Sequence, residues 1–337
     1  MALNFRVLGA GVWGLAFSDY LLKLGHNVEI FCRETNNSDK NIKALSLSNV
    51  SNKDIKSLDT LNDYRSSDEI NIIAVNSKGF SKLLERHKSY FDRLTTLVSL
   101  TKGLDHESGR YFSDYVFNLF NNIENYGLIS GPSFAKDLCD GKKISVSFAT
   151  LDDNLSKSMV ESTKSSQFEM IPTRHLRHIE IAGIMKNIAA ILCGMADKYF
   201  GKGLHTNIII KKACEAAWQT GVEAFKTFNP DNNVHGIDDL IKERDSIITS
   251  PGYIGDMILT CKQDQSRNYQ FGKLIADINV SIEEAKNIIG TVEGYDCCLT
   301  VFEKSQSNLD ELTNLLYQII NSQNMNRKKL LIDFLQV

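Results

Sequence analysis

Short apolar runs rich in β-branched residues alternate with longer helical patterns along the first half of the chain. Strand patterns cover residues 4–8, 27–32, 70–75, 96–100, 128–130, 144–149 and 168–171, and a helical pattern over 12–24 separates the first two. Because strands that alternate with helices are joined by crossovers, this half predicts a parallel sheet. After Ile179 the strand patterns nearly vanish and helical periodicity takes over. The pattern therefore predicts an α/β half followed by an all-helical half.

This change of pattern places a domain boundary near residues 172–180, where Pro172 is expected to break local structure. We assign residues 1–176 to a first domain and residues 177–337 to a second. The length of 337 residues agrees with two domains of about 150 residues each. The polar, charged segment Asn229–Ser250 predicts a surface excursion or a short solvated helix.

Composition narrows the class of protein. Hydrophobic residues make up 42% and charged residues 23% of the chain, which excludes collagen-like and disordered classes. A net charge of -3 gives no general electrostatic reason to expect nucleic acid as a partner. Any site for an anion must therefore be local.

The cysteines and the apolar segments indicate a cellular location. Seven cysteines form an odd set without CxxC spacing, which argues against a disulfide framework and against a metal site. The N-terminus lacks the pattern of a signal peptide. The longest apolar stretch, Ile179–Ala196, contains Glu180 and Lys186, so we expect no membrane insertion. Reduced thiols in a cytoplasmic protein fit these observations.

A glycine-rich turn carries the first candidate chemistry. Gly9, Gly11 and Gly14 form a complete GxGxxG directly after a strand pattern and at the start of a helical one. In a Rossmann-type fold the first glycine allows the tight turn, the second admits a pyrophosphate and the third lets helix and strand pack closely. The motif predicts a dinucleotide site; a tight turn without a ligand is the alternative.

The residues at the end of the second strand bear on the choice of cofactor. The sequence there is Phe31-Cys32-Arg33-Glu34. An arginine in this place suits the 2′-phosphate of NADP, whereas an acid suits the ribose of NAD. Arg33 therefore favours NADPH, use of NADH through Glu34 is possible, and a solvated surface arginine is the alternative.

A lysine interrupts an otherwise apolar helical pattern. The segment from Ile181 to Leu192 is apolar on every face except at Lys186 and Asn187, which indicates a buried helix. A buried ammonium is costly without partners, and a lysine in such a place is suited to general acid/base chemistry. The alternative is a side chain that reaches the surface of the domain.

Polar clusters follow several other predicted elements. Lys102 follows the strand pattern that ends at residue 100, where ligands bind in open parallel sheets. The small residues Gly131 and Ser133 follow another strand and leave backbone N–H groups available to an anion. In the helical half, the pair Arg267-Asn268 is suited to a phosphate. Together with the glycine turn and the buried lysine, these clusters suggest reduction of a small phosphorylated carbonyl compound.

The chain resembles bacterial NAD(P)-dependent glycerol-3-phosphate dehydrogenases. The motifs that carry the resemblance are GAGVWG, TKGLDHESGR, ISGPSFAKDL, IAGIMKNIAAILCGMAD, GDMILTCKQDQSRNYQFGKL and TVEGY, within residues 4–300. The resemblance implies interconversion of dihydroxyacetone phosphate and sn-glycerol 3-phosphate with NAD(P)H, which supplies glycerol 3-phosphate for phospholipid synthesis. It also implies a cytoplasmic homodimer.

The resemblance further implies roles for individual residues. Lys186 would be the general acid/base, and Lys102 a second lysine that contacts substrate and cofactor. Asn187 and Asp256 would position these groups, Asp256 by pairing with a lysine. The implied substrate contacts are Lys102, Gly131, Ser133, Lys186, Asp256, Ser266, Arg267 and Asn268, with Arg267 on the phosphate. The implied cofactor contacts are Gly9, Gly11, Val12, Trp13, Gly14, Arg33, Lys102, Ala135, Arg267 and Glu293.

The chain departs from this family pattern in three places. Asn76 stands where the family usually has proline, which is expected to loosen its loop. Gly203 stands where the family has asparagine. The stretch between Glu215 and Asp256 is longer than usual, mostly within Asn229–Ser250.

Two other functions remain open on the sequence. The departures motivate a non-catalytic NAD(P)-binding sensor of the same fold, although a sensor need not retain a buried lysine. A related hydroxyacid dehydrogenase would share the two-domain plan without requiring the cluster Ser266-Arg267-Asn268.

Overall fold

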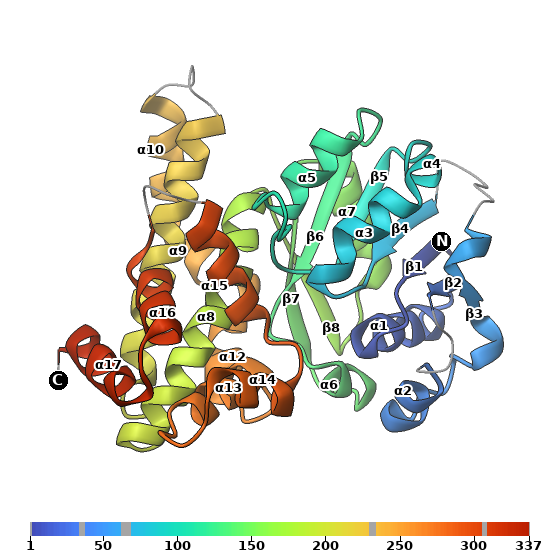
Figure 1. Cartoon of the computed structure of the whole chain (residues 1–337). Helices are drawn as coiled ribbons and strands as arrows, with labels where there is room; N and C mark the ends of the chain where they lie inside the picture. Colours follow the sequence, from blue (N-terminus) through green and yellow to red (C-terminus); the bar gives the residue numbers. More distant parts are fainter. Residues whose placement is uncertain (1, 34–37, 62–68, 229–233, 305–308, 337) are drawn as a thin grey trace. The chain divides into compact units, whose positions relative to one another are not determined.

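A sheet of eight strands organises the N-terminal part of the chain (Figure 1). In this computed structural model, the residues described are 2–33, 38–61, 69–228, 234–304 and 309–336. The chain divides into unit 1, residues 1–105 and 110–176, and unit 2, residues 106–109 and 177–337. The predicted fold class, a Rossmann-type domain followed by a helical domain, is confirmed.

The strands of unit 1 lie in the order β3-β2-β1-β4-β5-β6-β7-β8. Their bounds are β1 Asn4–Leu8, β2 Asn27–Cys32, β3 Ile55–Ser57, β4 Glu69–Ile73, β5 Thr96–Ser99, β6 Asn125–Ser130, β7 Ile144–Thr150 and β8 Phe168–Thr173. The helices of unit 1 are α1 Val12–Lys23, α2 Ser38–Leu45, α3 Ser77–Arg86, α4 Lys88–Phe91, α5 Phe112–Leu119, α6 Ala135–Cys139 and α7 Asp153–Thr163. The order reverses between β1 and β4, and open α/β sheets bind their ligands at such a point.

The sheet is parallel from β3 through to β6 but not beyond. β7 runs antiparallel to β6, with Ser130 opposite Ser147, and β8 is parallel to β7. The expectation of a purely parallel sheet was therefore wrong at this pair. The segment between β6 and β7 contains only the five-residue helix α6, and it returns the chain at the edge where β6 ends.

Pro172 does not break the structure at the predicted boundary. It lies inside β8, paired with Phe148 of β7. A proline has no backbone N–H to donate, and β8 is an edge strand, so no ladder bond is lost on its open side.

Alternating strand residues build the core of unit 1. Phe5 and Val7 of β1 point to the same face as Ile70 and Ile72 of β4, and all four are buried. Residues of α1, α6 and α7 pack against this face. This packing fixes the start of α1 relative to the ends of the strands.

Unit 2 is helical throughout the residues that the structure describes. Its helices are α8 Leu176–Phe200, α9 Thr206–Phe228, α10 Val234–Lys242, α11 Arg244–Ile248, α12 Asp256–Lys262, α13 Arg267–Ile275, α14 Ile282–Ile289, α15 Glu293–Lys304, α16 Glu311–Asn321 and α17 Arg327–Leu335. A π-helical turn, Pro251–Gly255, leads directly into α12. The polar segment Asn229–Ser250 contains α10 and α11, and its residues 229–233 lie outside the described part.

The central helix of unit 2 is α8, the predicted apolar helix. By length and composition it could cross a membrane, yet 94% of its most apolar window is buried inside the fold. A side chain on Gly194 of α8 would overlap the backbone of α13, and a side chain on Gly272 of α13 would overlap the backbone of α8. These two glycines bring α13 against α8 and so place its first residues.

Candidate active site

The glycine turn has the backbone geometry that the motif predicts. Gly9 has φ +130°, and a side chain there would overlap the carbonyl oxygen of Ala74, which follows β4. Gly14 is packed against the carbonyl of Gly9 in the same way. A Cβ on Gly11, by contrast, would lie 3.8 Å from its nearest neighbour, the Ala74 oxygen. Gly9 and Gly14 are therefore needed by the fold, whereas Gly11 leaves space above the turn.

The start of α1 fits a bound pyrophosphate. Gly11 is the N-cap, no acidic residue lies in the first turn, and Val12 is 48% exposed. The free N–H groups and the helix dipole at such an end attract anions. Trp13 donates from Nε1 to the backbone oxygen of Ser133 over 3.0 Å, which ties the turn to the loop after β6.

The loop after β6 is held tightly by packing. A side chain on Gly131 would overlap the backbone of Val146 in β7. The hydroxyl of Ser133 donates to the backbone oxygen of Gly131 over 3.3 Å. Ala135 is buried as the first residue of α6. These predicted residues therefore lie together, next to Trp13.

Arg33 and Lys102 lie after β2 and β5, at the same edge of the parallel sheet as the glycine turn. Arg33 is exposed and Lys102 is half-buried. Thr101 donates from its hydroxyl to the backbone oxygen of Val75 over 2.8 Å, and Gly103 has φ +130°, so the loop that carries Lys102 is fixed on both sides. Glu34, the residue that would favour NAD, lies outside the described residues.

Asn76 does more than fill the place of a proline. It is the N-cap of α3, and its side-chain oxygen accepts from the N–H of Gly79 over 2.8 Å. The expected loosening of this loop is therefore opposed by a capping bond that proline could not make.

In unit 2, Lys186 is held by two partners on α12. Its Nζ lies 2.9 Å from Oδ1 of Asp256 and 3.2 Å from Oγ1 of Thr260, and its side chain is 12% exposed. Thr260 donates its own hydroxyl to the backbone oxygen of Asp256 over 2.7 Å, which turns a lone pair toward the ammonium. An ammonium has three N–H donors, so one remains for a further acceptor.

Asn187 joins three helices through its carboxamide. Its Nδ2 donates to Glu293 over 3.3 Å, and its Oδ1 accepts from Nδ2 of Asn268 over 2.9 Å. Asn268 in turn accepts from the N–H of Gly294 over 2.9 Å. These bonds hold the side chains of Asn187, Asn268 and Glu293 in one orientation, beginning at the residue that follows Lys186.

Arg267 stands apart from this network. It is exposed at the first position of α13, and it forms no ion pair with any described residue. Ser266 is the N-cap of the helix and accepts from the N–H of Tyr269. A guanidinium at a helix N-terminus is well placed for a phosphate, because the helix end adds its own attraction.

Tyr269 and Asp197 anchor α13 behind Arg267. The Tyr269 hydroxyl donates to Oδ2 of Asp197 over 2.6 Å, while Oδ1 of Asp197 accepts from the N–H of Gly203 over 2.8 Å. Burial, together with the Asp197 carboxylate, raises the pKa of Tyr269, so its hydroxyl remains a donor. Gly203 has φ +81°, a conformation in which glycine and asparagine are both common.

The structure thus gathers the predicted residues into two groups, one in each unit. Within unit 2, Lys186 pairs with Asp256, and Asn187, the next residue of α8, bonds to Asn268 and Glu293. Thr260 was missed by sequence reasoning, although its position four residues after Asp256 on one helix could have indicated it.

Metal ligands and disulfides do not contribute to either group in the part of the chain that the structure describes. No cluster of three or more histidine, cysteine or acidic residues that could hold a metal occurs there. All seven cysteines are free thiols.

A glycine-rich turn on a parallel sheet, followed by a helical unit with a lysine–aspartate pair, defines a dehydrogenase that uses a nicotinamide dinucleotide. Residues 4–156 match the family described as NAD-dependent glycerol-3-phosphate dehydrogenase N-terminus, and residues 176–330 match its C-terminus counterpart. The chain belongs to the NAD-dependent glycerol-3-phosphate dehydrogenase family. The resemblance drawn from the motifs is confirmed.

Individual relatives agree with this assignment. Glycerol-3-phosphate dehydrogenase [NAD(P)+] of Beijerinckia indica is 27% identical over 86% of this chain and 83% of its own. The enzyme of Halorhodospira halophila with the same name is 27% identical over 95% and 93%.

Solved structures place the fold in the same group. Glycerol-3-phosphate dehydrogenase from Coxiella burnetii has a TM-score of 0.79 at 23% identity, over 100% of this chain and 99% of its own. D-mandelate dehydrogenase has a TM-score of 0.54 at 15% identity, over 99% and 100%. The fold of the hydroxyacid enzyme is therefore the less similar of the two.

Proposed function

We propose that this protein interconverts dihydroxyacetone phosphate and sn-glycerol 3-phosphate with NAD(P)H. The observation that carries the proposal is the Lys186 ammonium, nearly out of water, with two of its N–H groups occupied by Asp256 and Thr260. A lysine held in this way can give a proton to a carbonyl oxygen and keep a fixed direction while doing so.

The proton moves at Nζ of Lys186. In the reductive direction a dihydronicotinamide, held at the glycine turn of unit 1, would supply the hydride that the carbonyl carbon needs. Lys186 gives its third N–H proton to the oxygen, so the ketone becomes a secondary alcohol and the lysine becomes a neutral amine. Asp256 and Thr260 each hold one N–H of the ammonium before this step, so the direction of the remaining N–H is fixed.

The substrate phosphate is assigned to the start of α13. Arg267 offers paired N–H donors, and Ser266 and Asn268 flank it at the helix N-terminus. Asn187, fixed by Glu293 and Asn268, is assigned to the positioning of the substrate next to Lys186. Lys102, Gly131 and Ser133 of unit 1 complete the proposed set of substrate contacts.

The dinucleotide is assigned to the glycine turn of unit 1. Gly9, Gly11 and Gly14 shape the turn, while Val12, Trp13 and Ala135 lie at or next to it. Glu293 and Arg267 of unit 2 and Lys102 of unit 1 are the remaining proposed contacts. Arg33, exposed after β2, favours NADPH over NADH through the 2′-phosphate.

The cellular setting follows from the same assignment. We infer a cytoplasmic homodimer whose product supplies the backbone of phospholipids, and the free thiols agree with a reducing compartment.

Initial rates with dihydroxyacetone phosphate, followed by the loss of absorbance of NADPH or NADH, test the proposal. We expect turnover with both cofactors and a larger kcat/KM with NADPH. Binding of the dinucleotide without turnover, over a panel of phosphorylated ketones, would instead identify a sensor. Turnover of 2-oxoacids alone would identify a hydroxyacid dehydrogenase.

A further inference from the structure

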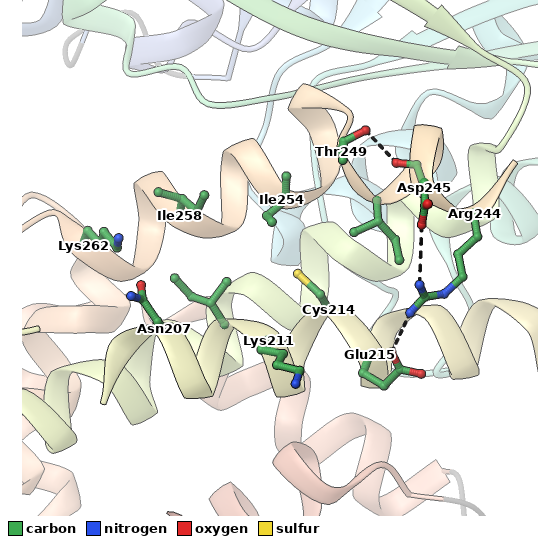
Figure 2. A pocket seen from close by; sticks show the side chains of 12 residues that line it. Asn207, Lys211, Cys214, Glu215, Arg244, Asp245, Thr249, Ile254, Ile258 and Lys262 are labelled. Atoms are coloured by element: carbon green, nitrogen blue, oxygen red, sulfur yellow. Dashed lines mark hydrogen bonds and ion pairs between the residues drawn. The ribbon is translucent and has the colours of Figure 1, made fainter. Parts of the chain in front are cut away.

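A cavity of about 400 Å³ lies within unit 2 between α9, α11 and α12 (Figure 2). Its lining includes none of the residues assigned above to substrate or cofactor. The volume falls in the range of about 300–1,000 Å³ that is usual for small-molecule sites. The cavity therefore needs an explanation other than the dehydrogenase reaction.

The middle of this cavity is apolar. Ile210 and Cys214 of α9 form one wall, and Ile254 and Ile258, from the π-helical turn and α12, form another. Ile258 is exposed, and contact of its apolar side chain with water is unfavourable in free energy. Such a surface favours an alkyl group as its occupant.

The two ends of the cavity differ in charge. Figure 2 shows Lys262 and Asn207 at one end and Arg244 at the other. Arg244 is already paired, with Glu215 over 2.8 Å and with Asp245 over 3.6 Å.

The ammonium groups in the lining have no such partner. Lys211 and Lys262 form no ion pair with any described residue, and they come from the two facing helices α9 and α12. Cations in the lining outnumber anions by one, because Arg244, Lys211 and Lys262 face only Glu215 and Asp245. An occupant with a single negative charge would balance this lining.

We propose that this cavity binds a small amphiphilic monoanion, a carboxylate on a short alkyl chain. The alkyl chain would lie along Ile210, Ile254 and Ile258, and the carboxylate would meet Lys262 and Asn207. Burial of the chain supplies the affinity, and the unpaired ammonium groups select the charge.

The cavity adjoins the helix that holds Lys186. Its α11 wall lies in the segment Asn229–Ser250. Its α12 wall carries Asp256 and Thr260 on the buried side of the same helix. One side of α12 thus lines the cavity, and the buried side of the same helix holds Lys186.

Calorimetric titration of the full chain with octanoate, octan-1-ol and octylammonium tests the class of ligand. We expect saturable binding of octanoate, weaker binding of octan-1-ol and weakest binding of octylammonium. Octan-1-ol or octylammonium binding as tightly as octanoate would overturn the anionic class, and no saturable binding of octanoate would overturn the site. None of these measurements depends on turnover.

A matched pair of variants tests the location. Ile258→Glu places a negative charge, of the same sign as the ligand, against the alkyl chain. It should weaken octanoate binding by roughly tenfold or more. Ile278→Glu makes the same change at an exposed isoleucine beyond α13 and should leave binding unchanged. Lys262→Ala should weaken the binding of octanoate by about threefold without affecting the binding of octan-1-ol. Lys329→Ala should affect the binding of neither ligand. Equal effects of the two isoleucine variants would overturn the location.

Cys214 provides a direct probe of occupancy. Burial raises the pKa of its thiol to about 11, so labelling with N-ethylmaleimide is best followed by mass spectrometry at mildly alkaline pH. Octanoate should slow labelling of Cys214 several-fold but leave the half-buried Cys139 of unit 1 unaffected. Unchanged labelling of Cys214 at saturating octanoate would place the ligand elsewhere.

Discussion

The two units build their proposed sites in opposite ways. In unit 1 the glycine turn offers backbone N–H groups, and its shape is set by three glycines within six residues. In unit 2 the chemistry lies in side chains of four helices, α8, α12, α13 and α15, that are far apart in the sequence. A backbone site fails when a Cβ is added, whereas a side-chain site fails when one partner is removed.

The largest effect is expected at Lys186. Lys186→Met keeps the length of the side chain and removes the proton donor, so kcat should fall by about 10²- to 10⁴-fold, with binding of the dinucleotide largely kept. Lys198→Met, on the exposed side of the same helix, is the control and should retain wild-type rates. Wild-type turnover in Lys186→Met would remove this residue from the acid/base role.

The matching test of unit 1 compares two glycines of the turn. Gly9→Ala forces a side chain into φ +130° and onto the Ala74 oxygen, and it should lower the free energy of unfolding by about 3 kcal/mol. Gly11→Ala has room for its methyl group and should stay folded. It should weaken binding of the dinucleotide, because the Cβ occupies the space above the turn. Urea unfolding and fluorescence titration with NADPH measure the two effects. Equal loss of stability in both variants would contradict the division of roles.

The contrast between the units also explains what the sequence could predict. The strand and helix patterns of unit 1 are local, so β1, α1 and β2 were placed to within a residue. β3 was missed because three residues carry too little periodicity, and the antiparallel step at β6–β7 was missed because the run of parallel strands gives no sign of it.

In unit 2 the candidate side chains could be found one by one, but the packing around them could not. Lys186 was conspicuous because a charge interrupts an apolar helix. Thr260 could have been indicated only through Asp256, four residues earlier on the same helix. The cavity beside α12 depends on how α9, α11 and α12 pack, and a pattern along the chain carries no information on such long-range contacts.

The next effect concerns the phosphate of the substrate. Arg267→Ala removes a charge-assisted contact and should raise KM for dihydroxyacetone phosphate by about 10- to 100-fold with a smaller change in kcat. Lys273→Ala, on the same helix and paired with Asp264, is the control and should leave KM unchanged. An unchanged KM in Arg267→Ala would rule out a contact between Arg267 and the substrate phosphate.

A smaller change is expected for cofactor choice. Arg33→Ala should raise KM for NADPH roughly tenfold and leave that for NADH unchanged, because only the 2′-phosphate needs the guanidinium. Lys23→Ala, at the far end of α1, should alter neither value. An equal rise in KM for NADPH and NADH would show that Arg33 supports the fold of its loop rather than binding the 2′-phosphate.

The smallest effect is expected at Asn76, where a side chain supports the backbone site of unit 1. Asn76→Ala removes the bond to the Gly79 N–H and should cost about 1 kcal/mol of stability, whereas Asn76→Asp keeps a capping oxygen and should cost much less. Asn76→Pro suits the observed φ of -72° but also loses the cap, so its stability should lie nearer to that of the alanine variant. Urea unfolding of the three variants measures these differences. If Asn76→Pro were more stable than the wild-type protein, rigidity of the loop would outweigh the cap, and the departure from the family pattern would be a weakness of unit 1.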